Sequence, residues 1–209
     1  MKKRVAIILI TLLGVGVSCQ KQPKASFTVS KSECYVGETV SLTSSSTDAS
    51  SYKWTIDNVS SGASSSLNFT PTSAGTKIIK LEGISKNGKK TDDDTKTLLV
   101  KNINEAFKGT YKGNANSGCE FENLAITTNG TNQISCDIDG TVITAVVNSL
   151  TNATIISYSE TDTDGSVLTI KGGSITLIGN TITTILNFSY YDATDSSTSS
   201  SSCTSVFVK

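Results

Sequence analysis

After residue 24 the chain alternates apolar and polar residues in short runs, a pattern typical of half-buried β-strands. Turn-forming pairs separate these runs, among them Asn87-Gly88, Asp139-Gly140 and Gly172-Gly173. No stretch in this part of the chain shows the 3.6-residue period of a surface helix. The pattern therefore predicts an all-β protein.

The first part of the chain predicts a sandwich of two sheets. Strands are expected at about 26–30, 35–42, 50–56, 67–70, 77–83 and 95–101. Tyr52, Trp54 and Ile56 share one face of a middle strand, and a single buried tryptophan there is typical of an immunoglobulin-like sandwich. We therefore expect Trp54 to be a core residue rather than a ligand platform.

Several short motifs in this part resemble a known family. Ala25-Ser26-Phe27, the run from Val36 to Val40, and Tyr52-Lys53-Trp54 follow each other as in PKD-type domains of extracellular proteins. The resemblance covers about 24–101, and we place the domain at 25–101. It implies a spacer or binding module without catalysis. The run from Trp54 to Val59 departs from the family pattern, so the resemblance does not imply a calcium site.

The second half, at 107–209, predicts an antiparallel meander after a linker at 102–106. Strands are expected at about 120–127, 132–138, 142–148, 154–160, 166–171, 174–178, 181–190 and 203–208. Short turns leave no room for crossovers, so the strands should close into a barrel or fold over as two sheets. The serine-rich segment 192–202 is expected to be a long mobile hairpin loop. Interior positions are predicted at Ile126, Ile134, Val142, Ile156, Leu168, Leu177 and Leu186.

Cysteine spacing alone does not settle the disulfides. Besides Cys19, the chain has Cys34, Cys119, Cys136 and Cys203, which allow three complete pairings. Since Cys34 is the only one in the first half, the residues favour one bridge in the second half with two free thiols, and leave an inter-domain bridge open.

The second half also resembles the small lipocalin-like domains of bacterial lipoproteins. The resemblance rests on Gly109-Thr110-Tyr111-x-Gly113, the meander and the closing strand at 203–209, and it covers about 105–209. In such domains an early and a late cysteine often pair. The resemblance therefore implies a Cys119–Cys203 disulfide, with Cys136 as a buried thiol.

The first 18 residues predict a signal peptide. Lys2-Lys3-Arg4 precedes an apolar run of 13 residues at 5–17, too short for a membrane-spanning helix of roughly 20. The run Gly16-Val17-Ser18-Cys19 resembles a bacterial lipobox. That resemblance implies cleavage before Cys19, lipidation of Cys19 and a tether at 19–24. By analogy with such lipoproteins, Gln20 in place of the Asp that commonly retains them at the inner membrane implies residence in the outer membrane, on either its surface or its periplasmic face. The alternative is ordinary secretion with a coincidental cysteine.

Composition narrows the function. Removing three basic residues with the signal leaves 18 − 3 = 15 basic against 18 acidic residues, a net charge of −3 with no basic tract, so a nucleic-acid partner is not expected. The chain has no histidine, which removes the commonest general base and zinc ligand. Asp137-x-Asp139-Gly140 and Asp162-x-Asp164-Gly165 lack the distal Glu of a calcium loop and are expected to be turns. No metal, cofactor or catalytic residue is predicted.

These observations predict a membrane-anchored envelope lipoprotein that binds without catalysis. The first domain would be the spacer, and the second would bind a glycan, a peptide or a small apolar ligand through residues that the sequence does not identify. One alternative is a structural or assembly lipoprotein acting through protein–protein contacts. The other is a hydrolase that uses carboxylates or a Ser–Lys pair.

Overall fold

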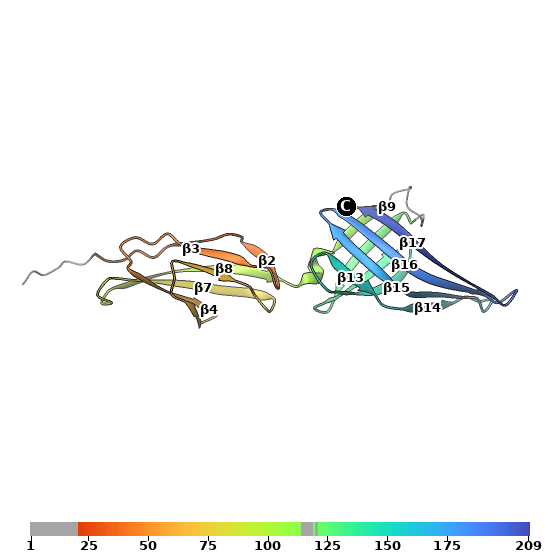
Figure 1. Ribbon diagram of the computed structural model, residues 1–209, viewed down its shortest axis with the longest axis horizontal. Coiled ribbons are helices and arrows are strands. Elements are labelled where there is room, and N and C mark those ends of the chain that lie inside the picture. Colours follow the sequence, from red (N-terminus) through yellow and green to blue (C-terminus); the bar gives the residue numbers. More distant parts are fainter. Residues whose placement is uncertain (1–20, 114–118, 120) are drawn as a thin grey trace, which may run out of the picture. The chain divides into compact units, whose positions relative to one another are not determined.

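The computed structural model describes residues 21–113, 119 and 121–209. The predicted signal and Cys19 lie outside these residues. The protein is all-β, with two sheets in the first part and a closed barrel in the second, as the strand pattern predicts (Figure 1). No helix in the described part of the chain is long and apolar enough to cross a membrane.

The first part contains a three-stranded and a five-stranded sheet. The smaller sheet has the order β1-β3-β6, with β1 at Phe27–Val29, β3 at Val40–Ser44 and β6 at Ser66–Phe69. The larger has the order β2-β8-β7-β4-β5, whose bounds are Glu33–Tyr35, Thr91–Lys101, Gly75–Ile84, Ser51–Ile56 and Val59–Gly62. β2 runs parallel to β8, whereas β7 is antiparallel to β4 and β4 to β5.

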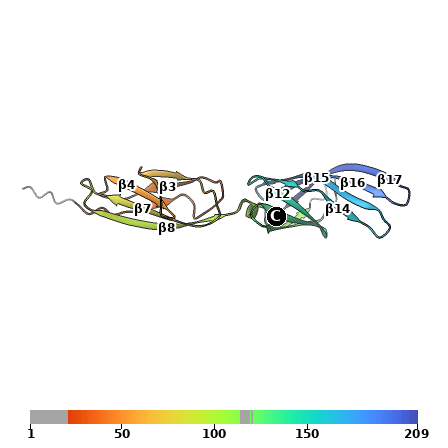
Figure 2. The same cartoon turned by 90° about the horizontal axis from the view of Figure 1, so that it is seen from below.

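Trp54 is a core residue, as expected. It is fully buried, and its ring meets Phe27 of the smaller sheet edge-on, with centroids 5.1 Å apart. The indole Nε1–H donates to the Ser64 carbonyl at 2.8 Å, which satisfies the one polar atom of the side chain. Its partner across the strands, Leu81, is also buried. The two sheets are therefore sandwich-like, with a core between them (Figure 2).

The second part is a closed barrel of eight antiparallel strands. In order around the wall they are β9 (Gly109–Gly113), β10 (Asn123–Asn129), β11 (Gln133–Ile138), β12 (Thr141–Val147), β13 (Asn152–Ile155), β15 (Val167–Ile178), β16 (Thr181–Asp192) and β17 (Ser197–Val208). The wall closes where β13 pairs with β15 and where β17 pairs with β9. β14 (Tyr158–Thr161) lies outside this ring and pairs with the first part of β15.

One end of the barrel is plugged by the segment predicted as a linker. Residues Ile103–Ala106 form the 3₁₀ helix η1, and Ile103 and Ala106 pack against the barrel core. The fully buried Asn104 donates from Nδ2 to the carbonyls of Gly130 and Gln133 at 3.1 and 2.8 Å. A polar side chain is favoured at this point of η1 because the backbone carbonyls at the β10–β11 turn need hydrogen-bond donors.

Gly172-Gly173 was predicted to be a turn, and this prediction is wrong. β15 continues through both residues, and its register with β16 shifts between Ile170 and Gly172. Here β15 changes its partner from β14 to β13. A Cβ on Gly173 would lie 1.9 Å from the carbonyl oxygen of Ile185, so the glycine allows the close approach of two backbones.

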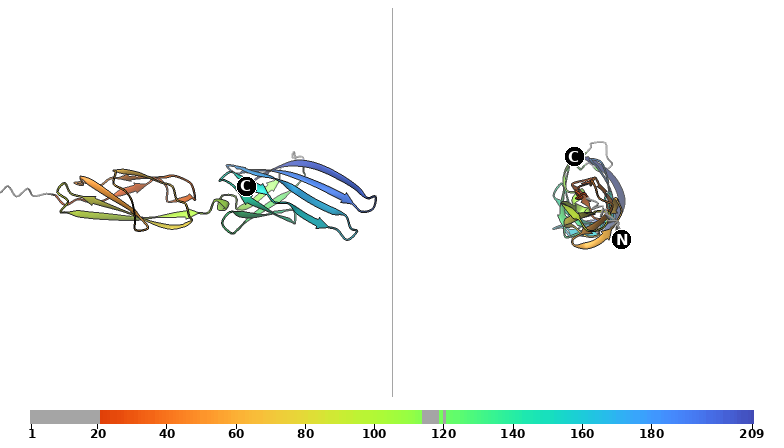
Figure 3. Two further views of the ribbon diagram at one scale, coloured as in Figure 1. Left: turned by 60° about the horizontal axis from the view of Figure 1, so that its bottom comes forward. Right: turned by 90° about the vertical axis from the view of Figure 1, so that its left-hand side faces the viewer.

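The serine-rich segment was predicted to be a mobile loop, and this too is wrong. Only residues 193–196 form the turn, and Ser197–Ser202 pair residue by residue with Asn187–Asp192. A segment of serine and threonine can still form a β-strand, because the hydrogen bonds between strands come from the backbone and do not depend on the side chain. The β14–β15 and β16–β17 hairpins extend beyond the ring (Figure 3).

Alternation correctly places most of the predicted interior positions, but not all. Ile126, Ile134 and Leu186 are buried, Leu177 packs against the core, and Leu168 lines a cavity. Val142 and Ile156, by contrast, are 52% and 41% exposed. The Asp139-Gly140 turn pairs Ile138 with Thr141 and Cys136 with Ile143, which turns Ile143 inward and Val142 outward. Ile155 faces inward, so its neighbour Ile156 faces out.

Candidate functional site

The strongest candidate site is an apolar cavity at the barrel end opposite η1, here called the mouth cavity. Its volume is about 220 Å³, and it opens to solvent. Nine residues line it: Phe121, Ile138, Thr141, Ile143, Leu168, Ile170, Leu186, Phe188 and Cys203. Nearly all its surface is apolar, with Thr141 as the one side chain that carries a hydroxyl. An apolar cavity of about 150 Å³ is enough to hold benzene, so this one can take a small apolar group.

The mouth cavity exists because the core fills only part of the barrel. Toward η1, the interior is packed by fully buried side chains such as Phe107, Tyr111 and Phe207. Tyr111 donates its hydroxyl to the Phe107 carbonyl at 2.8 Å, which fixes the ring in that end. Burial raises the pKa of this tyrosine. No aromatic ring of comparable burial faces the other end within the described residues, and the space there remains open.

A disulfide bounds the mouth cavity. The structure joins Cys119 to Cys203, the pair that the lipocalin-like resemblance implies, with Cα atoms 5.6 Å apart. Ser205 also donates to the Cys119 carbonyl at 3.2 Å, so the segment before β10 is held against β17 by two links. Cys203 itself lines the cavity. The disulfide therefore fixes part of the wall of the site.

The two remaining described cysteines are free and buried. Cys136 lies in the barrel core, and burial raises the pKa of its thiol to about 12, so it stays protonated and unreactive. Cys34 lies on β2 in the first part of the chain. Burial also raises the pKa of its thiol, and the Glu38 carboxylate adds to that effect. Neither thiol has the lowered pKa of a nucleophile.

A second pocket, here called the rim pocket, adjoins the mouth cavity. It has a volume of about 290 Å³ and is lined by Glu160, Asp162, Ser166, Leu168 and Tyr190. Leu168 lines both spaces. Strand pairing explains this, because Glu160, Leu168 and Tyr190 are direct partners across β14, β15 and β16 and so share one face.

The same face carries the apolar lining one step further in. Tyr158, Ile170 and Phe188 form the next row of cross-strand partners, two residues along each strand. Ile170 and Phe188 line the mouth cavity, and the Tyr158 hydroxyl donates to Glu160 Oε2 at 3.0 Å. That hydrogen bond raises the pKa of Tyr158. One sheet face thus changes from apolar to acidic as it leaves the barrel.

The Asp-x-Asp-Gly motifs serve as turns. Asp137 Oδ1 accepts from the Gly140 amide at 2.8 Å. The Asp139 carboxylate accepts from the amides of Glu122 and Asn123, and these bonds hold the pKa of Asp139 below its usual range. Across the described residues, no group of three or more His, Cys, Asp or Glu side chains is arranged to hold a metal ion.

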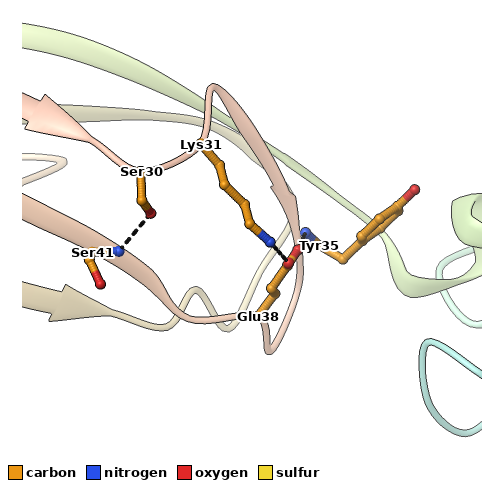
Figure 4. A network of polar contacts seen from close by, with 5 residues as sticks. All are labelled: Ser30, Lys31, Tyr35, Glu38 and Ser41. Carbon is orange, nitrogen blue, oxygen red and sulfur yellow. Dashed lines mark hydrogen bonds and ion pairs between the residues drawn. The ribbon is translucent and has the colours of Figure 1, made fainter.

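The first part contains a polar network around Lys31, and its geometry is structural (Figure 4). Lys31 forms an ion pair with Glu38, whose Oε2 also accepts from the Tyr35 amide at 3.0 Å. The hydrogen bond with Glu38 raises the pKa of Lys31, which is opposite to what a lysine base requires. Ser30 Oγ accepts from the Ser41 amide at 3.0 Å instead of approaching the lysine. This cluster is therefore not a Ser–Lys dyad.

The sequence identified only two of the residues that line the pockets. Alternation marked Leu168 and Leu186 as interior, but it gave no reason to select Phe121, Ile143 or Phe188. A local signal was the alternation of Tyr158 and Glu160 on β14, with Asp162 directly after the strand. This alternation does not by itself indicate a pocket, because the pocket forms only with the strands that pair beside β14.

Comparisons with known proteins do not assign the chain to a family. No protein-family model matches it, and no curated protein matches it. Among solved structures, it is similar to a carbohydrate-binding module of the β-sandwich superfamily, with 16% identity, coverage of 90% of this chain and 92% of that one, and a TM-score of 0.37. It is also similar to fibronectin(III)-like modules of Clostridium thermocellum CbhA, with 12% identity, coverage of 87% and 91%, and a TM-score of 0.34. These TM-scores are too low to indicate a function.

Proposed function

We propose that this protein is a lipid-anchored envelope lipoprotein that binds a small apolar ligand, or the apolar end of a larger one, in the mouth cavity without chemical change. The observation that carries the proposal is the cavity itself, an open apolar space at one end of a barrel whose other end is densely packed and plugged. Burying apolar surface there is favourable by roughly 25 cal/mol per Å².

The size of the cavity limits the ligand. Sites that enclose a whole drug-sized molecule usually measure about 300–1,000 Å³, and the mouth cavity is smaller at about 220 Å³. A ligand of that size class would enter with one end and leave the rest outside the ring of strands. A single ring or a short acyl segment would fit whole.

The remaining parts of the proposal rest on the sequence. Lipidation at Cys19 is supported by the lipobox resemblance, outer-membrane residence by Gln20 in place of a retaining Asp, and the spacer role of 25–101 by the PKD-type resemblance. Binding without catalysis is supported by the absence of histidine and by thiols whose raised pKa values keep them protonated. The sandwich at the first part also keeps its aromatic Trp54 in the core, unavailable to a ligand.

Titration with the neutral fluorescent probe N-phenyl-1-naphthylamine tests the binding. Leu168→Phe should place a larger side chain in the cavity opening and weaken probe binding by about tenfold or more. Ile178→Phe is the matched control, because Ile178 is 73% exposed on β15 and lines neither pocket. Its affinity should equal that of the parent. No binding by the parent, or equal weakening in both variants, would overturn the proposal.

A further inference from the structure

The rim pocket gives the proposed apolar site a charge preference. Glu160 and Asp162 are both exposed carboxylates on the face that leads out of the mouth cavity, and the Tyr190 ring lies beside them in the lining. Leu168 separates this acidic surface from the apolar lining by a single residue. A ligand whose apolar end fills the cavity would therefore bring its other end to these groups.

The hairpins beside the rim pocket carry charge of one sign. The two hairpins that form this end, at 156–170 and 187–202, contain Glu160, Asp162, Asp164, Asp192 and Asp195 and no lysine or arginine. Lys171 is the adjoining cation, and its Nζ reaches Ser200 Oγ at 3.3 Å. Ser200 alternates with Ser199, the partner of Tyr190, so it belongs to the opposite face of β17. No described cation neutralises the rim pocket on its own face.

Four of these acids accept hydrogen bonds from backbone amides of their own turns, and two of the five, Glu160 and Asp162, line the rim pocket. Asp164 accepts from the Ser166 amide at 2.8 Å, Asp192 from the Thr194 amide at 2.8 Å, and Asp195 from the Ser197 amide at 2.8 Å. Glu160 Oε2 accepts from the Tyr158 hydroxyl at 3.0 Å and Asp162 Oδ1 accepts from the Thr163 amide at 3.1 Å, so each of these bonds occupies one oxygen of its carboxylate. An aromatic ring next to carboxylates is the arrangement that attracts an ammonium group, through charge and through the face of the ring.

We propose that the ligand is a cationic amphiphile, whose apolar chain occupies the mouth cavity and whose ammonium group lies in the rim pocket against Glu160, Asp162 and Tyr190. This inference rests on the proposed function, because it assumes that the cavity takes the apolar end. Charge complementarity with the rim pocket favours a cationic head group over a neutral or anionic one. Because Leu168 lines both spaces, the head group of the ligand lies one residue away from its apolar chain.

Displacement of bound N-phenyl-1-naphthylamine by three amphiphiles with the same chain tests this inference. Decyltrimethylammonium, decyl maltoside and decyl sulfate are each titrated below their micellar concentrations. The cationic compound should displace the probe at about fivefold lower concentration than the maltoside, and the sulfate should be the weakest. The advantage should shrink in high salt, since exposed charges are screened.

Charge-removing variants identify the residues. Glu160→Gln with Asp162→Asn should abolish the advantage of the cation while leaving displacement by decyl maltoside unchanged. Glu82→Gln with Glu105→Gln removes the same charge from β7 and η1 and should leave the advantage intact. An equal response to all three heads, or an advantage that survives in the first variant, would overturn the cationic assignment with probe binding intact. Failure of the probe to bind at all would instead overturn the proposed function.

Discussion

The Cys119–Cys203 disulfide should provide a large share of the barrel's stability. It closes a loop across a sequence separation of 84 residues, from the segment before β10 to the last strand. The chain-entropy estimate for a loop of that length is about 4.5 kcal/mol. Total stabilities of domains are about 5–15 kcal/mol. We therefore expect Cys119→Ala with Cys203→Ala to lower the free energy of unfolding of the barrel by about 4 kcal/mol.

The chain offers a separate reporter for each of its parts. Trp54, the single tryptophan, is fully buried in the first part, so its fluorescence follows unfolding there. Cys136 is a buried free thiol in the barrel, and pulse alkylation in urea followed by peptide mass mapping follows barrel opening. The double variant should shift the alkylation midpoint to lower urea and leave the Trp54 midpoint in place. A loss below about 1 kcal/mol, or an equal shift in both midpoints, would refute the reasoning.

Two further predictions concern β15 and the anchor. Gly173→Ala should lower the free energy of unfolding by about 2 kcal/mol more than Gly172→Ala. The new Cβ would lie 1.9 Å from the Ile185 carbonyl oxygen in the first variant, but 3.6 Å from the Ile155 carbonyl oxygen in the second. Urea denaturation of both variants measures the difference, and equal losses would contradict the prediction. Cys19→Ala should move the protein from the membrane fraction to the soluble fraction of the expressing cells, as an immunoblot would show, whereas Cys34→Ala should leave it membrane-bound; an unchanged distribution of Cys19→Ala would contradict lipidation.

Short-range patterns predicted most of the strands and several turns. β11 alternates Ile134, Cys136 and Ile138 with polar neighbours, and this period-two signal is complete within six residues. Asn87-Gly88 and Asp139-Gly140 lie at turns, with glycine φ angles of +71° and +95°. Such signals can be read from neighbours because they depend on backbone conformations that the residues themselves favour or forbid.

Some segments suit more than one local conformation, and the strands that pair with them decided which one they adopt. Gly172-Gly173 suits a turn equally well, yet it forms a bulge because β15 pairs first with β14 and then with β13. Val142 and Ile143 are both apolar, and only the register with β11 shows which one faces inward. The serine-rich segment becomes a strand because β16 extends far enough to pair with it.

The sequence by itself determined that the protein is all-β, that Trp54 is a core residue, and that the chain contains no histidine and, after the predicted signal, no basic tract. The tertiary structure decided where the candidate site lies. The mouth cavity draws its lining from residues between Phe121 and Cys203, and the rim pocket from three strands whose pairing sets Glu160, Leu168 and Tyr190 side by side. Such contacts join residues far apart in the chain, and they exist only once the barrel has closed, so no local pattern can specify them.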